Sequence, residues 1–133
     1  MAVTTQTLVD AADDLVIKIT KKFTNTTNES ATNIVDVSGL AANAGGTACS
    51  AVAIQKIKAQ ISGVTVELLW DATTDVSCLK LDGDVDMDYS DVPGERALTN
   101  NSAAGKTGDL LLTTTGAASG DFFNIVLYCL KKY

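Results

Sequence analysis

Four acidic residues in the second half of the chain have the spacing of calcium ligands. They are Asp84, Asp86, Asp88 and Glu95, at the first, third, fifth and twelfth positions of an EF-hand loop. The sixth position of such a loop needs a glycine for its sharp turn, but here it is Tyr89, and Pro93 interrupts the loop. We therefore favour the solvated acidic face of a β-strand, with a calcium site at these four residues as the alternative. We expect no other metal and no cofactor.

The residue types that commonly carry hydrolytic chemistry form incomplete sets. The chain has no histidine, so neither a Ser-His-Asp triad nor a Cys-His pair can form. Asp71 and Asp75 could act as an acid–base pair, but they flank a turn, where aspartates commonly cap backbone amides. Gly105-Lys106-Thr107 is similar to the end of a P-loop, yet Asn100 stands where that motif needs its first glycine. We expect a protein that is not an enzyme.

The segments that would position these residues alternate between apolar and polar side chains. Val64, Val66, Leu68 and Trp70 share one side of a first strand. After a turn at residues 71–75, the same period of two continues from Ser77 to Tyr89, which predicts one long second strand. An amphipathic helix would repeat its apolar positions every three to four residues. The parity of Trp70 favours core packing over an exposed platform for sugar stacking.

Further alternating segments predict a fold made of strands. They are Leu15–Thr24, Thr32–Val37, Ala51–Ile61, Asp109–Thr114 and Asp121–Leu130. A change of parity at Gln55–Lys56 predicts a β-bulge, or else two strands. We predict an all-β fold, either an antiparallel β-sandwich or a jelly-roll-like barrel. The length of 133 residues suits one domain, spanning residues 15–133, with residues 1–14 as an N-terminal arm.

Charge and cysteine content limit the partners that we expect. Ten basic and sixteen acidic residues give a net charge of −6, which disfavours nucleic acid as a partner. No segment is apolar enough for a membrane span, and the first residues do not resemble a secretory signal. The three cysteines have no metal-type spacing, so we expect buried thiols in a reducing cytosol, with a disulfide as the alternative.

The last predicted strand is apolar on both faces. Phe123, Ile125, Leu127 and Cys129 alternate with Phe122, Val126, Tyr128 and Leu130. Such a strand is either covered within its own domain or presents one face to another subunit. The residues that we predict for an interface are Leu8, Val9, Phe122, Phe123, Val126, Tyr128 and Leu130.

Three segments of the chain resemble small virion structural proteins of tailed bacteriophages, especially those that infect cyanobacteria. The most distinctive is Leu68-Leu69-Trp70-Asp71-Ala72-Thr73-Thr74-Asp75-Val76, and Met1–Asp10 and Gly108–Thr114 are similar as well. Residues 82–91 and 25–33 do not follow the family. The resemblance implies a non-enzymatic protein, most closely a capsid decoration or cement protein. It would be made in the host cytoplasm and carried on the capsid surface of the virion. Its expected partners are the major capsid protein and further copies of itself, as a dimer or a trimer.

Two other functions remain open at this point. One is a tail, collar or fibre-associated virion protein, which would share the fold and composition but be present in few copies. The other is a carbohydrate-binding β-sandwich module, which would use Tyr89 or Trp70 as an exposed aromatic platform.

Overall fold

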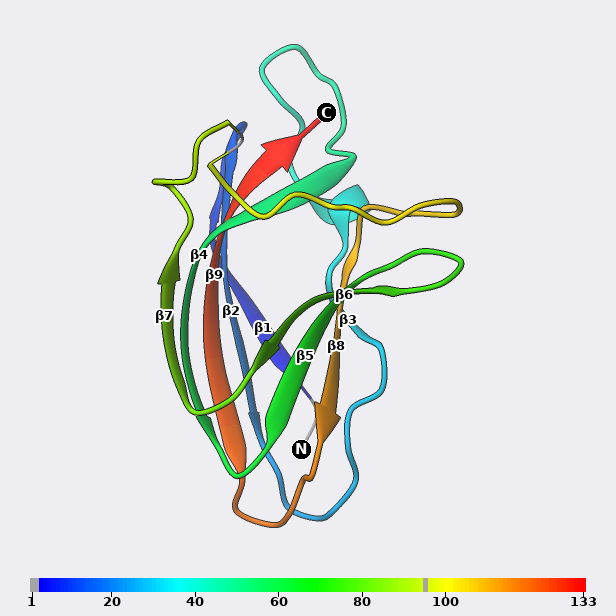
Figure 1. The fold of residues 1–133 in the computed structure, drawn as a ribbon. Coiled ribbons are helices and arrows are strands. Elements are labelled where there is room, and N and C mark those ends of the chain that lie inside the picture. The colour runs from blue at the N-terminus through cyan, green and yellow to red at the C-terminus, as the bar shows by residue number, and fades with distance from the viewer. Residues whose placement is uncertain (1–2, 95) are drawn as a thin grey trace.

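Two antiparallel β-sheets pack face to face in the computed structural model, which describes residues 3–94 and 96–133 (Figure 1). The five-stranded sheet contains β1 (Thr4–Asp10), β2 (Asp14–Lys22), β9 (Phe122–Lys132), β4 (Ala51–Ser62) and β7 (Asp84–Asp88), in that order. The four-stranded sheet contains β3 (Thr32–Val35), β8 (Leu110–Thr115), β5 (Thr65–Trp70) and β6 (Val76–Leu81). A short 3₁₀ helix, η1 (Val37–Gly39), follows β3. The all-β prediction and its sandwich form are confirmed.

The core lies between the two sheets, because each strand directs every second side chain inward. Leu68 and Trp70 of β5 are 0% and 1% exposed, as their parity predicted. Phe123 of β9 packs against Phe23, with 6.1 Å between the ring centroids, and is 0% exposed. Phe123 therefore belongs to the core and is not accessible to another subunit.

A β-bulge in β4 lies where the sequence predicted one. The register of β4 against β9 shifts between Ile54 and Lys56. The extra residue, Gln55, changes the parity of the strand, so that both Ile54 and Ile57 are fully buried. After the bulge, Lys56 and Lys58 of β4 point away from the core.

The predicted long strand from Ser77 to Tyr89 is wrong, because the structure divides it between the two sheets. β6 ends at Leu81 and pairs with β5, whereas β7 begins at Asp84 and pairs with β4. The two residues between them form a turn in which Gly83 has a φ of +68°. Glycine adopts that left-handed conformation without steric cost, and the chain can change sheets there.

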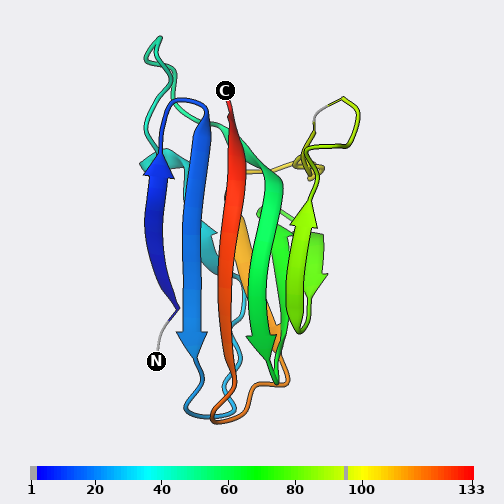
Figure 2. The same ribbon diagram turned by 90° about the vertical axis from the view of Figure 1, so that its left-hand side faces the viewer.

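Residues 4–10 of the segment predicted as an arm form β1 at the edge of the five-stranded sheet (Figure 2). Met1 and Ala2 lie outside the described residues. Among the described residues β1 pairs with β2 alone, and all seven residues of β1 are exposed. That Leu8 and Val9 of this segment belong to an interface stays a prediction.

The three cysteines are free thiols, as predicted. Cys49 and Cys129 are buried and Cys78 is partly buried. Burial raises the pKa of the Cys129 thiol to about 12, so this thiol stays protonated at neutral pH. In the described part of the chain, no helix is long and apolar enough to cross a membrane.

Candidate functional site

The outer face of the five-stranded sheet brings together most of the residues predicted for an interface. Figure 2 shows this face with β1, β2, β9, β4 and β7 side by side from left to right. Residues directly opposite one another in antiparallel strands share a face, so the pairing register defines rows across the sheet. One row consists of Gln6, Lys18, Val126, Lys58 and Asp86. The next row consists of Val9, Val16, Tyr128, Lys56 and Asp88.

An apolar strip runs along β9 in the middle of this face. We define it as Phe122, Val126, Tyr128 and Leu130, all of which are half-buried. Their alternate neighbours on β9 point inward and are buried, so the strand is apolar on both faces as predicted. A sheet with one face in water usually carries polar side chains there, which makes the apolar strip the unusual feature of this surface.

Lysines flank the apolar strip on both sides, and aspartates lie beyond them on one side. Lys18 and Lys22 lie on β2 on one side, and Lys56 and Lys58 on β4 on the other. The aspartates of β7 lie beyond β4, at the far edge of the sheet. Lys56 places its Nζ 5.8 Å from the centre of the Tyr128 ring, within the range of a cation–π contact. On this face β2 carries Lys18, Lys22 and, at its first residue, Asp14. The outer side chains of β9 are apolar, β4 contributes lysines and β7 contributes aspartates.

The second group of predicted interface residues lies on the edge strand β1. Leu8 is 49% exposed and Val9 is 43% exposed. The register of β1 against β2 shifts between Thr7 and Val9, which leaves Leu8 as the bulged residue. Leu8 and Val9 thus form an exposed apolar pair next to an unpaired sheet edge.

The three predicted calcium ligands that the structure describes do not form a metal site. Asp84, Asp86 and Asp88 are exposed along one face of β7, and Glu95 lies outside the described residues. Among the described residues, no group of three acidic or other ligating side chains could hold a metal ion. Asp88 caps the next turn: its carboxylate accepts a hydrogen bond from the Ser90 amide at 2.9 Å. Hydrogen bonding to Ser90 lowers the pKa of the Asp88 carboxyl, with a smaller contribution from Lys56.

The aromatic residues considered for carbohydrate binding are poorly placed for it. Trp70 is 1% exposed and belongs to the core. Tyr89 is half-buried, and its hydroxyl donates to the Met87 sulfur at 3.0 Å. Stacking on a sugar ring needs an open aromatic face, which Trp70 does not offer.

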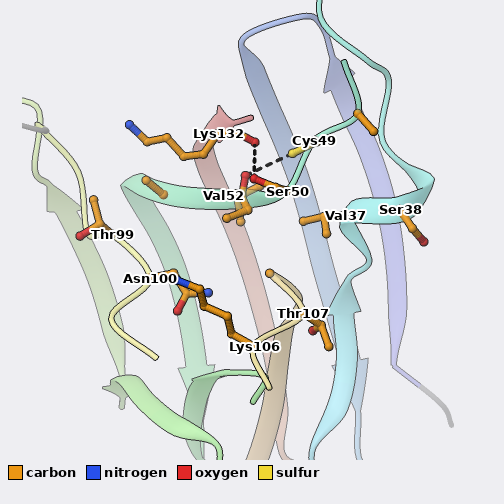
Figure 3. Close-up of a pocket in the computed structure, with 14 residues that line it drawn as sticks. Val37, Ser38, Cys49, Ser50, Val52, Thr99, Asn100, Lys106, Thr107 and Lys132 are labelled. Atoms are coloured by element: carbon orange, nitrogen blue, oxygen red, sulfur yellow. Dashed lines mark hydrogen bonds between the residues drawn. The ribbon is translucent and has the colours of Figure 1, made fainter. Parts of the chain in front are cut away.

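A pocket of about 860 Å³ opens at the end of the sandwich where β9 ends and β4 begins (Figure 3). Its wall consists of residues 48–53, 99–100 and 106–108 with Val37, Ser38 and Lys132. The residues similar to a P-loop, Lys106 and Thr107, are part of this wall. Thr107 also fixes the turn after β5, since its hydroxyl donates to the Asp71 carboxylate at 2.8 Å. Sequence reasoning missed the pocket, because its wall combines the connections before β4 and before β8 with the start of β4 and the end of β9, which are far apart in the chain.

The remaining carboxylate of that turn has a structural role. Asp75 accepts a hydrogen bond from the Ala72 amide at 3.1 Å, the capping arrangement expected from the sequence. Asp75 therefore caps this turn from within, and Asp71 ties it to Thr107 of another loop.

Comparisons with known proteins give no relative: no protein-family model, no curated protein and no solved structure matches this chain.

Proposed function

We propose that this chain is a non-enzymatic structural protein of a tailed-phage virion. It decorates the assembled head shell, binds the major capsid protein and stabilises the shell as a homo-oligomer. The resemblance of residues 68–76, with the similar segments at 1–10 and 108–114, supports the virion setting. Particle assembly takes place in the host cytoplasm, and the mature location is the capsid surface.

The apolar strip on β9 is the observation that supports this proposal most. The strip leaves parts of four apolar side chains in contact with water. Binding of another protein would bury this apolar area, which is favourable. A symmetric shell repeats the same contact many times. Even a small contact surface on each copy can therefore give tight binding when the copies are linked in an oligomer.

The exposed edge of β1 is the part of the surface that we assign to the shell. An unpaired sheet edge presents backbone amides and carbonyls to which another strand can add. Leu8 and Val9 place apolar side chains beside that edge. We expect the major capsid protein to contact these two residues and the adjoining edge.

Co-sedimentation with purified head shells that lack this protein tests the proposal. The wild-type chain should bind saturably, with a stoichiometry on the order of one copy per shell subunit. The double variant Leu8→Ser/Val9→Ser should lose binding while retaining its unfolding transition. Val92→Ser is the matched control, because Val92 is 47% exposed but lies in the loop after β7. Absence of saturable binding by the wild type would refute the decoration role.

A further inference from the structure

We propose that a second copy of this chain packs face to face on the outer surface of the five-stranded sheet. The two-fold axis of this dimer runs parallel to the strands and passes between β9 and β4. This dimer deepens the homo-oligomer of the proposed function and in that respect rests on it. Its contacts, however, follow from the charge pattern of the sheet and can be tested without a shell.

The first step is the position of each charge across the sheet. Lys18 on β2 and Asp86 on β7 occupy the same row, separated by Val126 on β9 and Lys58 on β4. Lys22 on β2 lies toward the same end of the sheet as Asp84 on β7. Within residues 3–94 and 96–133, neither Lys18 nor Asp86 takes part in a side-chain ion pair. Both charges are thus available to a partner.

The second step is the choice of symmetry axis. A two-fold axis perpendicular to the strands would place β7 on β7 of the second copy and oppose aspartates to aspartates. An axis parallel to the strands and centred on β9 would place β2 on β4 and oppose lysines to lysines. Like charges held together across an interface cost free energy, so both arrangements are disfavoured.

An axis between β9 and β4 places neither the β7 aspartates on each other nor the β2 lysines on the β4 lysines. The two-fold rotation about this axis places β2 of one copy on β7 of the other. The same contact occurs twice, once on each side of the dimer. Lys18 then lies opposite Asp86 of the second copy, and Lys22 lies near Asp84 of the second copy. Two equivalent sets of opposite charges form around the centre of the interface.

The same axis places β9 on β4 of the second copy. The apolar strip of one copy is then covered by the aliphatic stems of Lys56 and Lys58 of the other. Lys56 already lies over the Tyr128 ring within one chain, so its stem is oriented along the sheet surface. In the dimer, the Tyr128 ring of the second copy also lies opposite Lys56 and offers it a second cation–π contact.

The expected size of this contact predicts a dimer of moderate affinity. Four strands about eight residues long, with a spacing of about 4.8 Å and a rise of about 3.3 Å, give a footprint of roughly 500 Å² per copy. The pair then buries on the order of 1,000 Å², which is at the lower end of specific interfaces. Dimerisation should therefore depend on protein concentration and weaken at high salt.

Sedimentation velocity of the isolated chain over a range of concentrations tests the dimer. The wild type should shift from monomer to dimer as its concentration rises. Lys18→Asp and Asp86→Lys should each weaken dimerisation by about tenfold or more, because each opposes like charges twice per dimer. The double variant Lys18→Asp/Asp86→Lys restores the opposite charges and should recover the wild-type dissociation constant to within about threefold.

Two control variants distinguish the effect of losing this contact from the effect of changing the net charge. Lys106→Asp changes the net charge as Lys18→Asp does, but Lys106 lies on an exposed loop at the end of the sandwich. Asp82→Lys matches Asp86→Lys and lies in the turn between the sheets. Both controls should dimerise like the wild type.

The dimer is refuted by a wild type that stays monomeric at all concentrations, or by a wild-type trimer. Single variants that dimerise normally, or a double variant that fails to recover, refute it as well. The two proposals can fail separately. A dimer that does not bind shells contradicts the decoration role alone, and a monomer that binds shells contradicts the dimer alone.

Discussion

Lys131 and Asp10 lie 121 residues apart in the chain and form an ion pair that ties the last strand to the first. The Lys131 side chain is 0% exposed, and its Nζ also donates to the Ala41 carbonyl at 3.0 Å. Asp10 in turn accepts a hydrogen bond from the Ala41 amide at 3.1 Å. The hydrogen bond from Lys131 lowers the pKa of the Asp10 carboxyl. Three separate segments therefore meet at one buried ammonium group.

Replacement of Asp10 should destabilise the fold. Asp10→Asn leaves the buried Lys131 ammonium without its charged partner, which we expect to cost about 2 kcal/mol of unfolding free energy. Urea denaturation followed by Trp70 fluorescence measures this change. Asp14→Asn is the control, because it removes the same charge from an exposed position on β2. A loss as large in the control would show that net charge, rather than the pair, is responsible.

Stability should fall as the pH is lowered into the acidic range. The pKa of Asp10 is lowered by Lys131, and that of Glu29 is lowered by hydrogen bonds from Lys21 and Thr32. A carboxyl whose pKa is lower in the folded chain stabilises the fold fully above its unfolded pKa, and this contribution is lost as the pH falls through the folded pKa. The unfolding free energy should thus decrease from about pH 5 to about pH 2. Glu29→Gln should show a smaller decrease over the same range. An unfolding free energy that rises toward low pH would contradict this assignment.

The hydroxyl of Thr114 should contribute to stability through the loop before β3. It is 3% exposed, accepts a hydrogen bond from the Glu29 amide at 2.8 Å and donates to the Asn28 side chain at 3.2 Å. Thr114→Val keeps the shape but removes both bonds, and we expect a loss of about 1–2 kcal/mol in unfolding free energy. Thr115→Val, at an exposed position of the same strand, should stay within about 0.5 kcal/mol of the wild type. Equal values for the two variants would contradict this role.

Gly108 should tolerate alanine much less well than Gly120. Both residues have positive φ angles, +86° and +94°. An alanine Cβ at Gly120 meets nothing within 4 Å, whereas at Gly108 it would lie 1.9 Å from the Ser50 carbonyl oxygen. Gly120→Ala should cost about 1–2 kcal/mol from backbone strain alone. Gly108→Ala should cost about 2 kcal/mol more, because the loop must move away from β4. Thermal unfolding of the two variants side by side measures the difference.

The period-two pattern was sufficient to predict the fold class, the inward side of β5 and the bulge at Gln55. It was insufficient at residues 82–83, because the parity of apolar residues continues unchanged from Leu81 to Val85 while the chain changes sheets. A single glycine marked that position, and glycine in a strand is compatible with a bend as well as with a bulge. No strand was predicted at residues 4–10, because most of them are polar and show no apolar alternation. All seven are exposed in the structure.

The candidate interface could be predicted only in part. The two-faced pattern of β9 identified Phe122, Val126, Tyr128 and Leu130, but it gave no means of deciding which face was the inner one. Phe123 was therefore included, although it lies in the core. The flanking charges were not foreseen, because β2, β9, β4 and β7 become neighbours only through long-range pairing.

Quantitative mass spectrometry of phage particles purified from the source of this sequence tests the central claim most directly. It measures the copies of this chain relative to the major shell protein. The decoration role predicts a ratio on the order of one, because a shell lattice repeats an accessory subunit at every equivalent site. A few copies per particle would instead indicate a tail, collar or fibre position. Complete absence from the particles would contradict the virion proposal and make glycan binding the next function to test.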